Sequence, residues 1–246
     1  MKILRLTNSN DVASRLPASQ LSAAIADETV ARITGEQPDT TVRVIWPGPE
    51  LPSIVGRWIE RYDPDVVFLR ASSFWVCYES VPLRIQRRLG LLGRGVGALG
   101  LRVGGHPAVA SNPLARSLRT YAVRTIGGDT YFTPAEATAH VEATLRTVLS
   151  AESVIPVLRG PAHILNSSRN HAGYLRAQAR VFDFERRLAA LCGALHVSYV
   201  SARGPAADAE SFLPDQTHDD LPTQRVFGEL EGRAIAEAWL AAVGVR

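Results

Sequence analysis

The stretch Lys2-Ile3-Leu4-Arg5-Leu6-Thr7-Asn8-Ser9-Asn10-Asp11 passes from a short apolar run into a polar turn. The run over Lys2–Leu6 does not alternate cleanly between apolar and polar residues, which is typical of a parallel strand covered on both faces. Asn, Ser and Asp are common where a strand turns into a helix, because their side chains bond nearby backbone groups. The stretch therefore predicts a buried strand and leaves two interpretations of Ser9, a turn residue or a nucleophile.

The rest of the chain alternates between strand-like and helical patterns. The further strand-like runs are Thr41–Trp46, Asp65–Leu69, Ser153–Leu158 and His196–Val200. The helical patterns are Gln20–Ile33, Leu51–Tyr62, Pro134–Leu149, Tyr174–Leu191 and Thr223–Val243. Because right-handed crossovers place helices on both faces of a parallel sheet, the order predicts an α/β fold. We expect a three-layer α/β/α sandwich with a five-stranded parallel sheet.

The composition is that of an ordinary globular protein. Of the 246 residues, 46% are hydrophobic and 21% are charged, with a formal net charge of +3. Residues 1–246 are therefore expected to form a single domain. No signal-peptide pattern and no apolar run long enough to span a membrane is found, so we expect a cytoplasmic protein without a transmembrane segment and without a nucleic-acid partner. Cys77 and Cys192 form no CxxC pair and are expected to be reduced core residues, and the histidine spacing predicts no metal site.

Ligands bind at the carboxyl ends of the strands in such sheets, so the loops after the predicted strands are the place to look for chemistry. The last of these loops contains Asp215 and His218 just before the final helix. An Asp three residues before a His can bond one ring nitrogen and leave the other to take a proton from a hydroxyl such as that of Ser9. The other interpretation is a helix-entry loop with polar surface groups.

The order of these landmarks resembles the SGNH hydrolases, also called GDSL esterases, over most of the chain. The family's first block is matched by the strand that leads to Thr7-Asn8-Ser9, its second-block glycine by Gly48, and its DxxH block by Asp215 and His218. Pro64–Leu69 reproduces the strand before the third block. The resemblance implies a flavodoxin-like SGNH fold, a Ser9–His218–Asp215 triad, and an oxyanion hole that uses the backbone amides of Ser9 and Gly48.

Two departures from the family pattern concern this site. Thr7-Asn8 replaces the Gly-Asp that precedes the family's serine, and the loop Arg70–Trp75 lacks the asparagine that helps to hold the oxyanion. The third oxyanion donor would then be the hydroxyl of Ser72 or Ser73, or would be absent. Phe74 and Trp75 either line an acyl or aromatic pocket or pack in the core.

The resemblance implies serine-dependent hydrolysis of an acyl ester or thioester, either of a small molecule or of a carrier-bound acyl group, with no cofactor. An acyltransferase that uses the same triad and a non-catalytic binding protein are the alternatives. A nucleotide-binding flavodoxin-like protein is disfavoured, because the first loop lacks a glycine-rich phosphate cradle.

A basic Gly/Arg-rich insertion or cap is expected at about residues 81–128. From Val81 to Gly128 the sequence has eight arginines and no Asp or Glu. Such a segment could attract an acidic substrate, a carrier protein or an anionic membrane, or form a solvated face or a homodimer contact. It contains the GxGxxG match Gly95–Gly100, which we reject as a dinucleotide site because no strand precedes it and no acidic residue follows near position 120.

Overall fold

The computed structural model describes residues 1–8, 11–12, 16–85, 88, 114, 117–118, 121–122, 125, 128–162, 171–202 and 219–244. The chain divides into two compact units. The first consists of Met1–Ser72, Pro134–His163 and Phe182–Arg246, and the second of Ser73–Thr133 and Ile164–Val181. The first unit contains the predicted sheet.

A parallel sheet of five strands, in the order β2-β1-β3-β6-β7, forms the middle of the described part of the first unit. The strands are β1 (Lys2–Thr7), β2 (Asp39–Val44), β3 (Val66–Arg70), β6 (Ile155–Arg159) and β7 (Ser198–Val200). The predicted five-stranded parallel sheet is therefore confirmed. The strand ends differ from the predicted ones, because Thr7, Arg70 and Arg159 remain in the hydrogen-bonded ladder although their side chains are polar.

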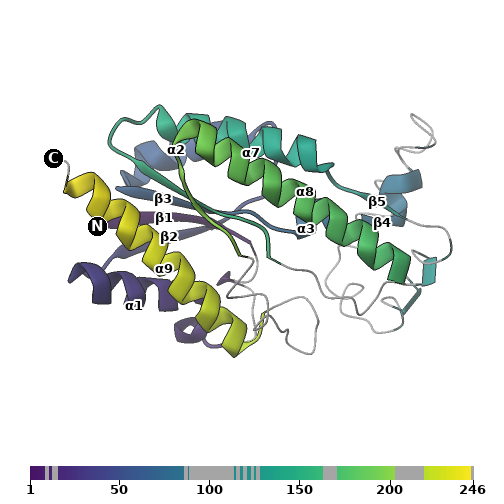
Figure 1. Ribbon diagram of the computed structural model, residues 1–246, viewed down its shortest axis with the longest axis horizontal. Coiled ribbons are helices and arrows are strands. Elements are labelled where there is room, and N and C mark those ends of the chain that lie inside the picture. Colours follow the sequence, from purple (N-terminus) through teal and green to yellow (C-terminus); the bar gives the residue numbers. More distant parts are fainter. Residues whose placement is uncertain are drawn as a thin grey trace. The chain divides into compact units, whose positions relative to one another are not determined.

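Helices cover both faces of this sheet, with α1 (Ser22–Thr34) and α9 (Leu221–Val243) on one face and α2 (Leu51–Tyr62) and α7 (Pro134–Leu149) on the other (Figure 1). The predicted bounds of α2 and α7 are confirmed. The last helix begins two residues earlier than predicted, because the Asp220 side chain accepts a hydrogen bond from the Thr223 amide and caps it. The long helix α8 (His171–Leu195) also extends beyond its predicted bounds.

The apolar core between the sheet and α9 is built from alternate residues of the strands. Ile3, Phe68 and Val157 project from β1, β3 and β6 toward Ile235 of α9, and all of them are at most 2% exposed. The same face continues toward the carboxyl ends of the strands with Arg5, Arg70 and Arg159. The core face thus changes from apolar to charged as it approaches the edge where the loops begin.

The α1 and α9 helices approach each other closely at two buried glycines of α9. A Cβ atom at Gly228 would lie 2.6 Å from the Ile25 Cβ, and one at Gly232 would lie 2.5 Å from the Ala26 carbonyl oxygen. These separations are shorter than van der Waals contact. The two helices can therefore pack this closely only because positions 228 and 232 carry no side chain.

Replacing Gly232 with alanine is expected to lower the free energy of unfolding by about 1–3 kcal/mol, since the new methyl group meets the α1 backbone. Gly193→Ala in α8 is the matched control, because a Cβ there would meet nothing within 4 Å. That variant should be up to about 1 kcal/mol more stable than wild type, through helix propensity. Urea denaturation compares the two, and equal effects would contradict the close packing.

The second unit contains the short helix α3 (Phe74–Cys77) and an antiparallel pair of strands, β4 (Glu79–Ser80) and β5 (Asp129–Thr130). These strands come directly before and after the segment predicted as an insertion, so they bring its two ends together. A Cβ at Gly128 would lie 2.8 Å from the Ser80 backbone nitrogen, which explains a glycine at this junction. Most of residues 81–128, including Gly95–Gly100, lies outside the described residues.

Both cysteines belong to the described part of the chain, where they are buried and form no disulfide, as predicted. Burial raises the pKa of Cys192 to about 12, so its thiol stays protonated at neutral pH. No helix in the described part of the chain is long and apolar enough to cross a membrane.

Candidate functional site

The carboxyl edge of the sheet is the predicted location of the site. Backbone pairing continues one residue past several strands: the Ile45 amide donates to the Thr7 carbonyl at 2.9 Å, and the Ala71 amide donates to the Arg159 carbonyl at 2.9 Å. The Gly160 amide likewise donates to the Val200 carbonyl at 2.8 Å. The loops after β2, β3 and β6 therefore leave the sheet from fixed positions.

The three predicted triad residues, Ser9, Asp215 and His218, lie outside the described residues, so their arrangement remains a prediction. Two acidic residues close to Ser9 and His218 in the sequence are described. Asp11 follows Ser9 by two residues and is 5% exposed, and Asp219 follows His218 directly and is 3% exposed.

The other predicted site residues are described, each within its own unit. Gly48 begins the turn before α2, its carbonyl accepts the Leu51 amide, and a Cβ there would meet nothing within 4 Å. Neither packing nor a positive φ therefore requires a glycine at this position. Ser72, the last residue of the first segment of the first unit, is buried. The role of Gly48 and Ser72 as oxyanion donors stays a prediction.

In the second unit, Ser73 precedes α3 and its carbonyl accepts the amides of Val76 and Cys77. Phe74 is 37% exposed and stacks on Tyr78 with a ring-centroid distance of 4.3 Å, whereas Trp75 is 1% exposed. Of the two predicted pocket aromatics, Phe74 therefore has surface available for a ligand, and Trp75 is packed inside. The oxyanion role of Ser73 and the substrate contacts of both aromatics remain predictions.

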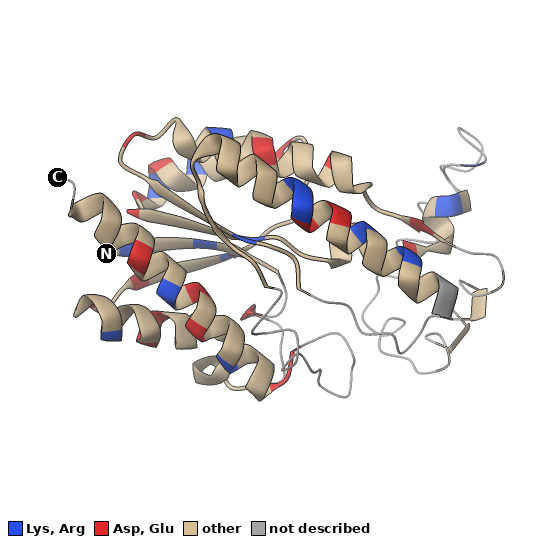
Figure 2. Cartoon of the chain, viewed as in Figure 1, with Lys and Arg blue, Asp and Glu red and all other residues tan. Residues whose placement is uncertain are grey.

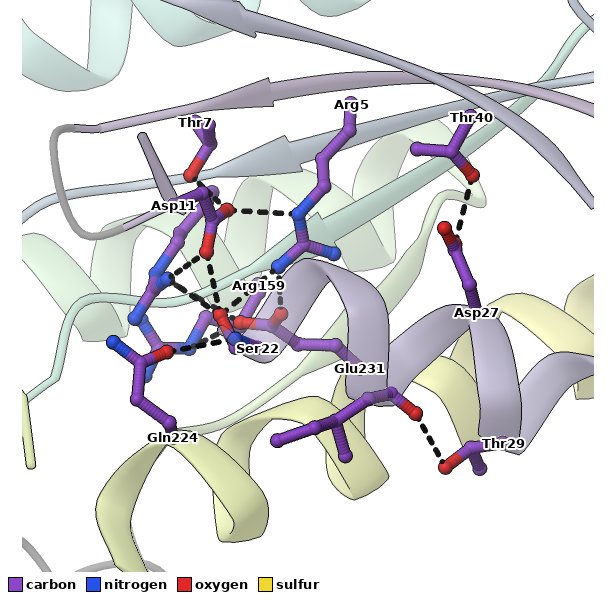
Figure 3. Close-up of polar contacts among 12 residues, drawn as sticks. Arg5, Thr7, Asp11, Ser22, Asp27, Thr29, Thr40, Arg159, Gln224 and Glu231 are labelled. Atoms are coloured by element: carbon purple, nitrogen blue, oxygen red, sulfur yellow. Dashed lines mark hydrogen bonds and ion pairs between the residues drawn. The ribbon is translucent and has the colours of Figure 1, made fainter. Parts of the chain in front are cut away.

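The most unusual feature of this edge is a buried charge cluster on the α1 and α9 face of the sheet, which no local sequence pattern predicted. Figure 2 shows basic positions on the strands within the sheet, and Figure 3 shows the polar contacts around them. The cluster consists, among the described residues, of the basic side chains Arg5, Arg70 and Arg159 and the acidic side chains Asp11, Asp219 and Glu231.

Glu231 of α9 lies among the three guanidinium groups. It accepts a hydrogen bond from Arg5, and its Oε1 lies 3.5 Å from the Arg159 Nε and 3.8 Å from the Arg70 Nε. Its side chain is 0% exposed, and each arginine is 1% exposed. A buried charge is tolerated only when it is paired, so this one carboxylate serves the arginines of three neighbouring strands.

Asp11, in the connection between β1 and α1, accepts hydrogen bonds from side chains of β1, β3 and α1. The donors are Thr7 Oγ1 at 2.5 Å, Ser22 Oγ at 2.6 Å, Arg5 Nε at 2.8 Å and Arg70 Nη1 at 3.2 Å. Burial by itself would raise the pKa of Asp11, but the charges of Arg5 and Arg70 outweigh it, so the pKa lies well below its usual range. Asp11 is therefore ionised at neutral pH and ties its segment of the chain to β1, β3 and α1.

Arg70, the last residue of β3, joins the first loop to the segment before α9. Its Nη1 lies 3.2 Å from the Asp11 Oδ1, and its Nη2 donates to the Asp219 Oδ2 at 3.1 Å. Burial raises the pKa of Asp219 more than Arg70 and Arg159 lower it, so the net shift is upward. With every group counted as ionised, the three basic and three acidic side chains of the described cluster balance in formal charge.

The sequence does contain one indication of this cluster, because each of three largely apolar strand segments includes one arginine. Arg5, Arg70 and Arg159 occur in ILRL, VVFLR and IPVLR. Since strands covered on both faces have no water to solvate a guanidinium, each of these arginines required a buried acidic partner. The partners come from elsewhere in the chain, and that pairing could not be read from local patterns.

Replacing Asp11 with asparagine is expected to lower the free energy of unfolding by about 3 kcal/mol at pH 7, because it leaves Arg5 and Arg70 underpaired. A carboxyl group with a depressed native pKa stabilises the fold above its unfolded pKa of about 4, and this contribution disappears as the pH falls below that value. The difference between wild type and Asp11→Asn should therefore shrink toward pH 3.

Asp219→Asn is the matched comparison for this prediction. The native pKa of Asp219 is raised, so its ionised form is disfavoured in the fold and its neutral isostere should cost less at pH 7 than Asp11→Asn does. Urea denaturation at pH 7 and pH 3 measures both variants. A loss for Asp11→Asn that does not change with pH would contradict the assigned ionisation.

Comparison with known proteins identifies the fold. No family model and no curated protein sequence matches the chain. Among solved structures, the psychrotrophic esterase EstA from Pseudoalteromonas sp. is 10% identical with a TM-score of 0.57, and 98% of each chain is covered. Est24, a carbohydrate acetylesterase from Sinorhizobium meliloti, is 11% identical with a TM-score of 0.56, covering 96% of this chain and 98% of its own.

A third structure, from Desulfitobacterium hafniense, is of a protein assigned to the G-D-S-L family of lipolytic proteins. It is 9% identical with a TM-score of 0.52, and the match covers 95% of this chain and 98% of that one. These structural similarities extend over nearly the whole length of each chain, although the sequence identity is low. They are therefore evidence for a shared fold. The chain therefore has the α/β/α fold of the GDSL-type esterases and lipases.

Proposed function

We propose that this protein is a serine-dependent hydrolase of acyl esters or thioesters that acts through an acyl-enzyme. The fold is shared with esterases, and the sequence places Ser9 after β1 and Asp215 and His218 before α9. In the proposed reaction, Ser9 Oγ attacks the acyl carbonyl carbon while His218 takes its proton. His218 then returns the proton to the leaving alcohol or thiol as the acyl–oxygen or acyl–sulfur bond breaks.

The second half of the reaction repeats these steps with water. His218 removes a proton from a water molecule, the water attacks the acyl-enzyme, and the carboxylic acid leaves as Ser9 regains its proton. Asp215 orients the His218 ring and stabilises its charged form. The amides of Ser9 and Gly48 stabilise the negative oxygen, and the Ser72 or Ser73 hydroxyl takes the place of the family's asparagine.

The observation that carries this proposal is the bridge made by Arg70. One guanidinium binds both Asp11 and Asp219, which belong to segments more than 200 residues apart in the sequence. Consecutive Cα atoms are about 3.8 Å apart, so Ser9 is two such steps from one end of the bridge and His218 is one step from the other. This supports a shared site for the predicted nucleophile and the predicted base.

Hydrolysis of p-nitrophenyl acetate, butyrate and octanoate, and of an acyl thioester, tests the proposal. Removal of the general base in His218→Gln should reduce kcat by about 10²–10⁴-fold. The control is His140→Gln, at a histidine on α7, which should retain wild-type kcat. Equal activity in the two variants, or no hydrolysis of any of these compounds by wild type, would argue against the proposed function.

A further inference from the structure

Arg70 combines an extreme burial with contacts to two distant segments of the chain. Its side chain is 1% exposed, and its Nη1 and Nη2 atoms reach Asp11 and Asp219 at 3.2 and 3.1 Å. Its Nη1 also donates to the Ser22 Oγ at 3.1 Å, so the guanidinium is anchored to α1 as well. Arg70 is itself the final residue of β3, the central strand of the described sheet, and is therefore attached to a rigid element.

The chemistry of arginine suits a bridge of this kind. A guanidinium is planar and presents its N–H donors in a fixed fork, so two nitrogens can hold two carboxylates at a set separation. A lysine ammonium is a compact charge on a flexible stem and cannot impose that geometry. The ring of Phe227 on α9 lies 5.5 Å from the Arg70 Cζ and limits the positions available to the guanidinium.

We propose that Arg70 is a positioning residue that holds the loop containing Ser9 and the loop containing His218 at a fixed separation, through Asp11 and Asp219. This inference rests on the proposed function, since it assigns Arg70 a role in aligning that nucleophile and base. Arg70 does not touch the reacting atoms in the proposed reaction. It acts through Asp11, two residues after Ser9, and through Asp219, directly after His218.

Arg5 provides the control that separates alignment from stability. It is as buried as Arg70, and it binds Asp11 at 2.8 Å and also Glu231. Among the described residues, its contacts do not include Asp219. Arg5→Lys should therefore destabilise the same charge cluster while leaving the connection between Asp11 and Asp219 in place.

The experiment compares wild type, Arg70→Lys and Arg5→Lys by hydrogen–deuterium exchange and by steady-state ester hydrolysis. In Arg70→Lys, amide exchange should become faster in peptides covering residues 8–12 and also in peptides covering residues 213–220. In Arg5→Lys, only the first set should change. Misalignment should reduce kcat of Arg70→Lys by about 10–100-fold at unchanged KM, whereas Arg5→Lys should stay within about threefold of wild type.

Asp219→Asn serves as a second variant in case Arg70→Lys does not fold. It weakens one arm of the bridge, so faster exchange is expected over residues 213–220 alone. If wild type hydrolyses no ester but Arg70→Lys accelerates exchange in both segments, the proposed function is wrong and the bridge remains. If wild type is active and Arg70→Lys and Asp219→Asn change neither exchange nor kcat, or Arg5→Lys and Arg70→Lys lose the same kcat, the positioning role is wrong.

Discussion

Replacing Glu231 with glutamine should lower the free energy of unfolding by about 5 kcal/mol, the upper end of the loss seen when a buried ion pair is broken. Glu231 is 0% exposed and lies within 3.8 Å of nitrogens from Arg5, Arg70 and Arg159. Glutamine has nearly the same shape but no charge, so it would leave three buried guanidinium groups with two carboxylates. Urea denaturation followed by far-UV circular dichroism measures the loss.

Glu229→Gln is the matched control for this variant. It makes the same chemical change two residues away on the same helix, at a position exposed to solvent. Substitutions at such surface sites usually change stability by less than about 0.5 kcal/mol. Similar losses for the two variants would show that the charge of Glu231 does not hold the cluster together.

Replacing Ser9 with alanine should reduce kcat for ester hydrolysis by about 10⁴-fold or more, because the variant lacks the oxygen that forms the acyl-enzyme. Residual activity is expected from the oxyanion donors and from substrate binding, which do not depend on the Ser9 hydroxyl. The rate of p-nitrophenolate release from a short-chain ester, measured at saturating substrate, gives kcat for both proteins.

The control for Ser9→Ala is Ser53→Ala, which removes a hydroxyl from an exposed position on α2. This variant should retain wild-type kcat and KM. Ser9→Ala should also unfold within about 0.5 kcal/mol of wild type, unlike the charge-cluster variants. A Ser9→Ala protein with more than a tenth of wild-type kcat would rule out Ser9 as the nucleophile.

The sheet and its helices were predictable because each element has a strong local pattern. The bounds of α2 follow from an amphipathic period, and the start of α7 follows from a proline at the first helical position. The strands were found as short aliphatic runs, but their ends were not, because Thr7 and Arg70 continue the ladder with polar side chains. Backbone pairing, rather than side-chain type, decides where these strands stop.

The charge cluster is where local patterns give no information about partners. Arg5 and Glu231 are 226 residues apart and meet only because α9 packs over the face of the sheet that carries the arginines. The close approach of α1 and α9 at Gly232 is hidden in the same way, since a glycine within a helix has no distinctive local pattern. The order of motifs indicated the fold, whereas its interior electrostatics depended on tertiary packing.

The most direct test of the serine-hydrolase proposal is intact-mass analysis after treatment with a fluorophosphonate, applied to wild type and to Ser9→Ala. The reagent transfers its phosphonyl group to an activated serine oxygen with loss of fluoride. We predict a single adduct on wild type and none on Ser9→Ala. No adduct on wild type, or an equal adduct on Ser9→Ala, would contradict the assignment of Ser9 as an activated nucleophile.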